Sequence, residues 1–131
     1  MRAWADVAVL AKTKNLKGRF VVRAAAGLPF LLEEGDEVAF GNQRLSVLYT
    51  PGHCDGSICL YNSENQFVIT GDLIFELSVG RSDLPTGSEP LLLQSIREKI
   101  LTLPDEVTLF PGHGFPTTVG KERRGNPFIQ M

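Results

Sequence analysis

The clearest pattern in the chain is an alternation of apolar and polar positions between residues 37 and 70. We interpret the run EVAFGNQRLSVLYT as two strands joined at a Gly-Asn pair, because both halves are rich in strand-forming residues and the pair tolerates a tight turn. The next run, SICLYNSENQFVIT, repeats the pattern, with strands expected near 57–62 and 66–70 and a polar turn between them. Four consecutive antiparallel strands are therefore predicted.

A helical period replaces this alternation in the run SEPLLLQSIREKILTLP. A proline falls in its first turn, another closes it, and one stripe is apolar, which predicts a helix over 89–103. The stripe consists of Leu92, Ile96, Ile100 and Leu103. A fifth strand is expected at 106–110, and the run TVGKERRG is interpreted as a short closing helix. We predict an α+β fold in which the five strands form one mostly antiparallel sheet with the main helix packed on one face.

The N-terminal segment differs from the rest in composition. Residues 1–27 hold six Lys/Arg and one Asp, whereas the remainder holds seven Lys/Arg and fourteen Asp/Glu. Apolar positions from Arg2 to about Leu16 suggest an amphipathic helix ended by Gly18. A targeting segment is an alternative, but the apolar run is short and contains no serine. We therefore expect residues 1–30 to be a helical segment of unclear origin, with an internal start or a disrupted gene as one explanation, and 31–131 to be a partial domain.

Composition narrows the class of protein. Hydrophobic residues make up 43% of the 131, and no apolar run approaches the roughly 20 residues of a membrane span. If SICLYN is a strand, Cys54 and Cys59 point to opposite faces, so a disulfide is not expected and a reducing cytoplasm is the default. The basic N-terminus lacks interleaved aromatic residues and any nucleic-acid motif. Neither a membrane nor a nucleic acid is an expected partner.

Three residues with metal-binding side chains share one setting. His53, Asp72 and His113 each lie just beyond a predicted strand and beside a glycine, and the chain has only two histidines. For any one of these residues alone, a structural role is the simplest interpretation. The ends of neighbouring strands, however, bring residues that are distant in the sequence close together. Imidazole nitrogen and carboxylate oxygen suit Zn²⁺, Fe²⁺ or Mn²⁺. The three together predict a metal site.

Five motifs in their order and spacing resemble the metallo-β-lactamase superfamily, in particular its hydroxyacylglutathione hydrolase (glyoxalase II)-like branch. They are TPGHCDGSICLY, VITGDLIF, VGRSDLP, SIREKILTLPDEVTLFPGHG and TTVGKERRGNPF, and they span about Leu32 to Gln130. The resemblance implies the C-terminal half of an αββα sandwich and metal-dependent hydrolysis of a small thioester or ester. It also implies His53 on a first metal, Asp72 bridging both metals as the catalytic carboxylate, and His113 on the second. The implied cofactor is zinc, or alternatively iron or manganese, which would activate a water nucleophile.

Residues beside these ligands have alternative interpretations. Cys54 could ligate a soft metal, but adjacent side chains rarely converge on one ion, so a packed thiol is favoured. Asp55 departs from the family pattern of a small residue followed by proline and is expected to face solvent. Arg81 is a candidate substrate-binding residue, with an ion pair to Asp83 as the alternative. Three residues are expected to fasten the C-terminal tail: Arg123, Arg124 and Asn126.

The family's main ligand motif, His-x-His-x-Asp-His, would lie upstream of His53, yet residues 1–52 contain no histidine. One hypothesis is an impaired hydrolase completed by another polypeptide or a neighbouring chain. The other, which we favour for this chain alone, is a non-catalytic truncated remnant with a weak three-ligand metal site. Half a sandwich would also leave an apolar sheet face bare. We therefore expect self-association or docking of a complementing N-terminal fragment.

Overall fold

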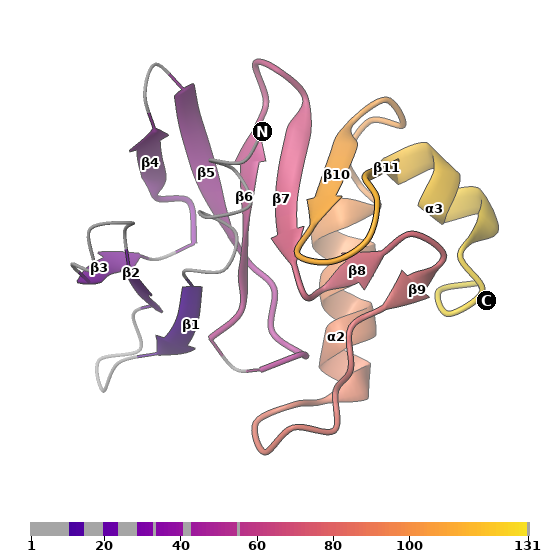
Figure 1. The fold of residues 1–131 in the computed structure, drawn as a ribbon, viewed down its shortest axis with the longest axis horizontal. Helices are drawn as coiled ribbons and strands as arrows, with labels where there is room; N and C mark the ends of the chain where they lie inside the picture. The colour runs from indigo at the N-terminus through magenta and orange to yellow at the C-terminus, as the bar shows by residue number, and fades with distance from the viewer. Residues whose placement is uncertain are drawn as a thin grey trace.

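A six-stranded sheet organises the computed structural model, which describes residues 11–14, 20–23, 29–32, 34–40, 43–54 and 56–130 (Figure 1). Its strand order is β11-β10-β7-β6-β5-β4. The strands are β4 (Glu37–Phe40), β5 (Gln43–Tyr49), β6 (Ile58–Asn62), β7 (Phe67–Gly71), β10 (Thr108–Pro111) and β11 (Thr117–Thr118). All neighbours pair antiparallel except β10 and β7, which are parallel. The predicted mostly antiparallel sheet of five strands is confirmed, with β11 added at one edge.

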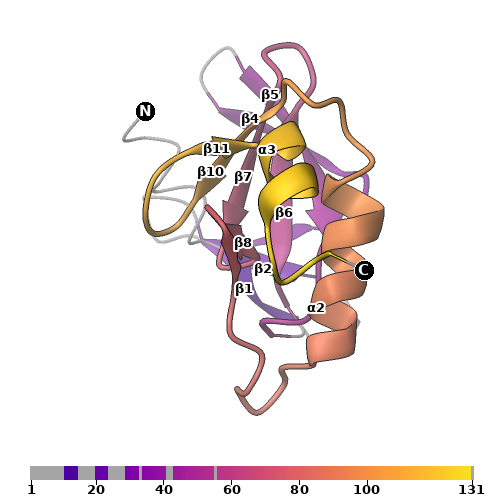
Figure 2. The ribbon, with the colours of Figure 1, turned by 90° about the vertical axis from the view of Figure 1, so that its right-hand side faces the viewer.

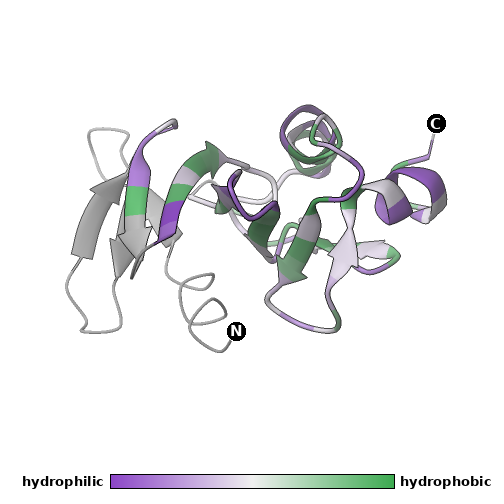
Figure 3. Cartoon of the chain, turned by 90° about the horizontal axis from the view of Figure 1, so that it is seen from above, coloured by the Kyte–Doolittle hydropathy of each residue, from purple (hydrophilic) through white to green (hydrophobic). Residues whose placement is uncertain are grey.

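Side-chain alternation divides the core between the two faces of this sheet. One cluster includes Cys59 and Val68 of the strands together with the buried stripe of the main helix. The other cluster consists of buried residues from β5, β6 and β7: Leu45, Val47, Ile58, Leu60, Phe67 and Ile69. Apolar residues accordingly follow the central strands and the helix, drawn green in Figure 3. The period of two in the sequence thus becomes two separate apolar layers.

The main helix lies on one face of the sheet (Figure 2). It begins as α2 (Glu89–Ser95), where the Ser88 side chain accepts a hydrogen bond from the Leu91 amide, and continues as a π-helical turn, η1 (Ile96–Ile100). Leu92, Ile96 and Ile100 are buried against the strands. The predicted helix is confirmed, although it ends three residues earlier than the apolar stripe suggested. The expected closing helix is present as α3 (Val119–Gly125).

Shorter elements complete the described fold. A two-stranded hairpin, β8 (Ile74–Phe75) and β9 (Ser78–Val79), follows β7 directly. A separate antiparallel sheet contains β1 (Ala11–Lys14), β2 (Phe20–Arg23) and β3 (Pro29–Leu32). The predicted N-terminal helix is therefore wrong for residues 11–14, which pair as a strand with β2. The rest of that predicted helix lies outside the described residues.

The face opposite α2 is apolar, as expected, but it is not bare. Leu45 and Val47 are completely buried, and Ile58, Leu60, Phe67 and Ile69 expose no more than 7% of their surface. The expectation of an exposed apolar face on the single chain is wrong at these positions. In the described part of the chain, no helix is both long enough and apolar enough to cross a membrane.

Candidate metal centre

Strand direction brings the three predicted ligands to one edge of the sheet. Since β5 and β7 are both antiparallel to β6, they run the same way, and β10 is parallel to β7. His53 follows β5, Asp72 follows β7 and His113 follows β10, so all three leave the same edge. A hydrogen bond of 2.8 Å from the Gly112 amide to the Gly71 carbonyl ties the last two strand ends together.

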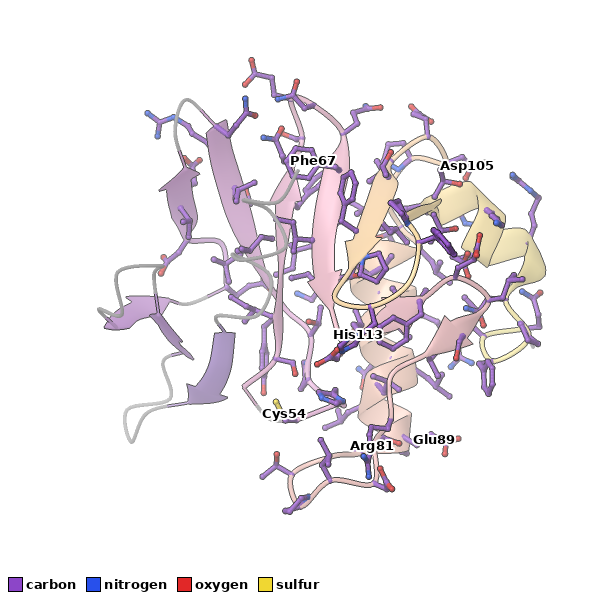
Figure 4. All side chains as sticks on the ribbon, viewed as in Figure 1. Cys54, Phe67, Arg81, Glu89, Asp105 and His113 are labelled. Carbon is purple, nitrogen blue, oxygen red and sulfur yellow. The ribbon has the colours of Figure 1, made fainter. Side chains whose placement is uncertain are left out.

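The three side chains meet around the Asp72 carboxylate. His53 Nε2 lies 3.5 Å from Asp72 Oδ2, and His113 Nε2 lies 3.5 Å from Asp72 Oδ1. Each oxygen therefore faces a different imidazole. Figure 4 shows His113, Cys54 and Arg81 near this end of the sheet, whereas Phe67 marks the opposite end of β7. The three side chains lie together as expected, but as two pairs that share Asp72 and not around one common point.

The orientation of His53 is set by a backbone carbonyl. Its Nδ1 lies 2.9 Å from the Arg81 carbonyl oxygen, which can only accept, so Nδ1 carries the proton and donates. When Nε2 carries no proton, its lone pair faces the Asp72 carboxylate, and a cation between the two atoms would be ligated by both. A metal-ligating histidine is commonly oriented by such a bond on its other nitrogen.

Donor chemistry and accessibility both suit a divalent ion. Imidazole and carboxylate donors fit zinc, iron and manganese. The side chains of His53 and Asp72 are 17% and 23% exposed, whereas that of His113 is 81% exposed. Among the described residues, no group of three or more His, Cys, Asp or Glu side chains surrounds one common ion position. The geometry is that of two His–carboxylate pairs sharing Asp72, with the His113 pair open to solvent.

A glycine allows the following hairpin to return against Asp72. The Gly80 amide donates to the Leu73 carbonyl at 3.0 Å. A Cβ atom at Gly80 would lie 1.7 Å from the Asp72 carbonyl oxygen, which no side chain could tolerate. On the same hairpin, the Phe75 ring lies 6.1 Å from the His113 ring, centroid to centroid, at a tilt of 44°. The hairpin therefore contacts both Asp72 and His113.

Arg81 contributes its backbone to the site, while its side chain pairs with a neighbour. The guanidinium Nε donates to Asp83 Oδ1 at 2.7 Å, and a second nitrogen donates to Oδ2 at 3.1 Å. These hydrogen bonds raise the pKa of Arg81 and lower the pKa of Asp83. The ion-pair alternative is thus what the structure shows, and contact of Arg81 with a substrate stays a prediction.

Cys54 and Cys59 are not joined by a disulfide in the structure. Cys54 is half-buried, with its Sγ 3.1 Å from Ser57 Oγ. Cys59 is fully buried in the sheet, and burial raises its pKa to about 12. Asp55, which was expected to face solvent, lies outside the described residues.

Sequence reasoning missed a buried carboxylate on the last helix. Glu122 of α3 is completely buried and accepts hydrogen bonds from the Leu77 amide at 2.8 Å, the Thr117 hydroxyl at 2.6 Å and the Asn126 side-chain amide at 2.9 Å. The surrounding Lys-Glu-Arg-Arg run is typical of a solvated helix. Burial of Glu122 could have been inferred only from its place on the helix, since residue 122 lies on the same helical face as Val119 and Asn126.

The expected structural role of the tail residues agrees with their contacts. Arg123 donates to the Leu103 carbonyl at 2.9 Å and also to the Leu101 carbonyl, and it pairs with Asp105. Arg124 pairs with the same carboxylate at 3.2 Å. These contacts join α3 to the end of the main helix.

Comparison with known proteins gives the same architecture. The model of the metallo-β-lactamase superfamily matches residues 7–113. Hydroxyacylglutathione hydrolase GloC of Haemophilus influenzae is 38% identical over 97 residues, covering 74% of this chain and 46% of GloC. A crystal structure of TTHA1623 in a di-iron-bound form aligns with 45% identity and a TM-score of 0.67, covering 74% of this chain and 46% of that one.

The match extends into the N-terminal segment. The B3 metallo-β-lactamase BLEG-1 aligns with 99% of this chain and 62% of its own, with 37% identity and a TM-score of 0.74. The family match therefore begins well before Leu32, where the motifs placed it. The chain spans about half the length of the curated relatives it matches. From the family model, these similarities and the mixed sheet with its covering helices, we conclude that the chain belongs to the metallo-β-lactamase superfamily.

Proposed function

We propose that the chain supplies three ligands of a two-metal centre that hydrolyses a small thioester or ester. The observation that carries this proposal is the Asp72 carboxylate, whose two oxygens each lie 3.5 Å from the Nε2 atom of a different histidine. A carboxylate so placed can bridge two cations, with His53 beside one and His113 beside the other. Similarity to GloC, which is named a hydroxyacylglutathione hydrolase, supports a thioester as the substrate class.

The chain's own residues would orient the ligands and admit the substrate. The Arg81 carbonyl holds the His53 ring, and Asp72 supplies the negative charge that the cations require. The His113 side is open, because its side chain is 81% exposed. Bound divalent cations would lower the pKa of a water molecule and polarise the substrate carbonyl. Zinc is the proposed metal, and the di-iron form of TTHA1623 supports iron as the alternative.

The small number of candidate metal ligands limits the activity that we propose for this chain by itself. It has two histidines, and residues 1–52 contain none. Each cation would therefore have one histidine and one Asp72 oxygen from this set, with water or another polypeptide completing the shell. We propose that hydrolysis by the chain alone is strongly impaired. The second candidate is a non-catalytic metal-binding protein, favoured by the absence, in the described part, of any cluster of three ligands around one position.

The first prediction concerns metal binding. Zinc titration of the purified chain by calorimetry should show weak binding that Asp72→Ala abolishes and His53→Ala weakens at least about tenfold, since each removes a ligand. Glu64→Ala, an exposed carboxylate in the β6–β7 turn, should bind zinc like the wild type and is the matched control. Zinc binding that survives Asp72→Ala unchanged would refute the metal centre.

Hydrolysis separates the two candidate functions. S-D-lactoylglutathione turnover should be slow with the zinc-loaded chain and should rise when the part of GloC outside the match is added as a second polypeptide. Asp72→Ala should abolish that rise. A chain that binds zinc through Asp72 but hydrolyses nothing, with or without the second polypeptide, would establish the non-catalytic candidate.

A further inference from the structure

One short hairpin contacts all three candidate ligands. The segment that contains it starts at Asp72, places Phe75 beside the His113 ring, and ends at Arg81, whose carbonyl accepts the hydrogen bond from His53. A shift of this segment would therefore change the contacts of all three side chains.

The far end of the hairpin is held from α3 by Glu122. Its Oε1 accepts from the Leu77 amide at 2.8 Å and from the Asn126 side-chain amide at 2.9 Å. The same Asn126 nitrogen donates to the Ser78 carbonyl at 3.0 Å. Leu77 of the turn and Ser78, the first residue of β9, are thus bonded to a buried polar pair at the end of α3, in a low-dielectric setting that strengthens each bond.

The turn needs such an anchor because of its backbone conformation. Leu77 has a φ of +59°, in the left-handed region that a leucine rarely adopts. The residue is 46% exposed, so packing alone does not hold it there. The bond from its amide to Glu122 stabilises this conformation, together with the ion pair of the adjacent Glu76 to Lys121 of α3.

The loop that carries His113 is also hydrogen-bonded to Glu122. His113 lies between β10 and β11, and Thr117, the first residue of β11, donates to Glu122 Oε2 at 2.6 Å. One buried carboxylate therefore joins the hairpin that follows Asp72 to the loop that carries His113. Of the described contacts, those of the neighbouring Arg123 go instead to Asp105 and the carbonyls of Leu101 and Leu103.

We infer that Glu122 is a remote positioning residue for the metal centre, because it fixes the relative placement of the two segments that carry Asp72 and His113. The inference rests on the proposed function for its consequence in metal binding. Its structural part is independent of any metal. Glutamine can replace this carboxylate, since its amide oxygen can accept in place of Oε1 and its amide nitrogen can donate to the Thr117 hydroxyl.

The test compares Glu122→Ala, Glu122→Gln and the control Arg123→Ala, which loosens the same helix from its other side. Amide hydrogen exchange, measured by NMR without metal, follows Gly80 and Gly112, whose amides bond to Leu73 and Gly71. The Thr50 amide, bonded to Ser57, is the reference within each protein. Zinc affinity is measured on the same samples.

Glu122→Ala should raise exchange at both site amides about tenfold relative to the reference and weaken zinc binding about tenfold. Glu122→Gln should stay near the wild type, and Arg123→Ala should change site and reference amides alike. Equal effects of Glu122→Ala and Arg123→Ala on the site amides would overturn the inference. If the wild type binds no zinc, the proposed function fails while the exchange comparison still decides the positioning role. If Glu122→Ala does not fold, Glu122→Asp, which withdraws the carboxylate by one methylene, takes its place with the same expected selectivity.

Discussion

Two carboxylates of the chain, Asp72 and Glu122, have opposite environments. Asp72 is partly exposed, and each of its oxygens faces an imidazole nitrogen. Glu122 is completely buried, and its oxygens accept three hydrogen bonds from neutral donors. The first environment favours recruitment of a cation, whereas the second satisfies the charge within the protein. Residue type alone does not distinguish these roles.

Because of Cys59, the free energy of unfolding should decrease at alkaline pH. Burial raises its pKa to about 12 from an ordinary value of 9.0, so the folded state keeps the proton while the unfolded state loses it above pH 9. The contribution of the protonated Cys59 thiol to the free energy of unfolding is complete below pH 9 and is lost as the pH rises toward 12. At pH 10 the free energy of unfolding should have fallen by about 1 kcal/mol from this group.

Urea unfolding of the wild type and Cys59→Ala between pH 8 and 10.5 measures this contribution. The packing lost in the variant is independent of pH, so the difference between the two proteins should shrink as the pH rises. A constant difference would show that Cys59 does not have the raised pKa.

The candidate ligands could be predicted because a histidine or aspartate beside a glycine, just after a predicted strand, can be recognised in the sequence alone. Their convergence follows from strand direction. The role of Arg81 could not be predicted in the same way, because it contributes a carbonyl that every residue possesses. Glu122 was missed since charged neighbours conceal a buried position on a short helix.

At the level of elements, the loop after β5 packs directly on the main helix. Gly52 has a φ of +142°, its carbonyl accepts from the Ser88 amide, and a Cβ atom there would lie 2.2 Å from the Leu92 Cα. The Ser95 hydroxyl also donates to the Pro51 carbonyl at 2.7 Å. These contacts place His53 relative to the start of α2.

Gly52→Ala should therefore destabilise the protein by about 3 kcal/mol, through backbone strain and overlap with the helix backbone. Gly35→Ala is the matched control, since Gly35 also has a positive φ, +86°, but nothing lies within 4 Å of an added Cβ. It should cost about 1 kcal/mol. Thermal unfolding checks both, and equal costs would argue against the close packing of this loop on α2.

Elements of four residues or more from residue 37 onward could be predicted from the spacing of their apolar residues. Strands at 37–70, the helix after residue 88 and the strand near 106 all have enough residues to show an alternation or a stripe. The two-residue strands β8, β9 and β11 are too short to show one. At the N-terminus, apolar spacing suited a helix, but residues 11–14 pair with the next strand along the chain, so strand pairing rather than the apolar spacing decided their conformation.

At the scale of the whole molecule, the sheet has a buried apolar layer on each face. Leu60→Ala on the face opposite α2 and Ile96→Ala on the helix side should each cost about 2 to 5 kcal/mol, because both side chains are at most 4% exposed. Denaturant unfolding at several protein concentrations measures both costs.

The same experiment tests the predicted self-association. If the layer containing Leu60 were completed by a second chain, the unfolding midpoint would rise with protein concentration. Midpoints that are independent of concentration, with equal costs for both variants, would show that the single chain completes both layers.

The parallel pairing of β7 with β10 has a consequence for the order of folding. Parallel strands cannot be joined by a tight turn, and here the hairpin, the main helix and their loops all lie between the two strands. Loop-closure entropy must be overcome before such a distant pair forms, so this pairing is slower than formation of the β5–β6–β7 meander. Asp72 and His113 become neighbours only at that step. If the chain binds zinc as proposed, the rate at which refolding restores that binding therefore reports when the crossover closes.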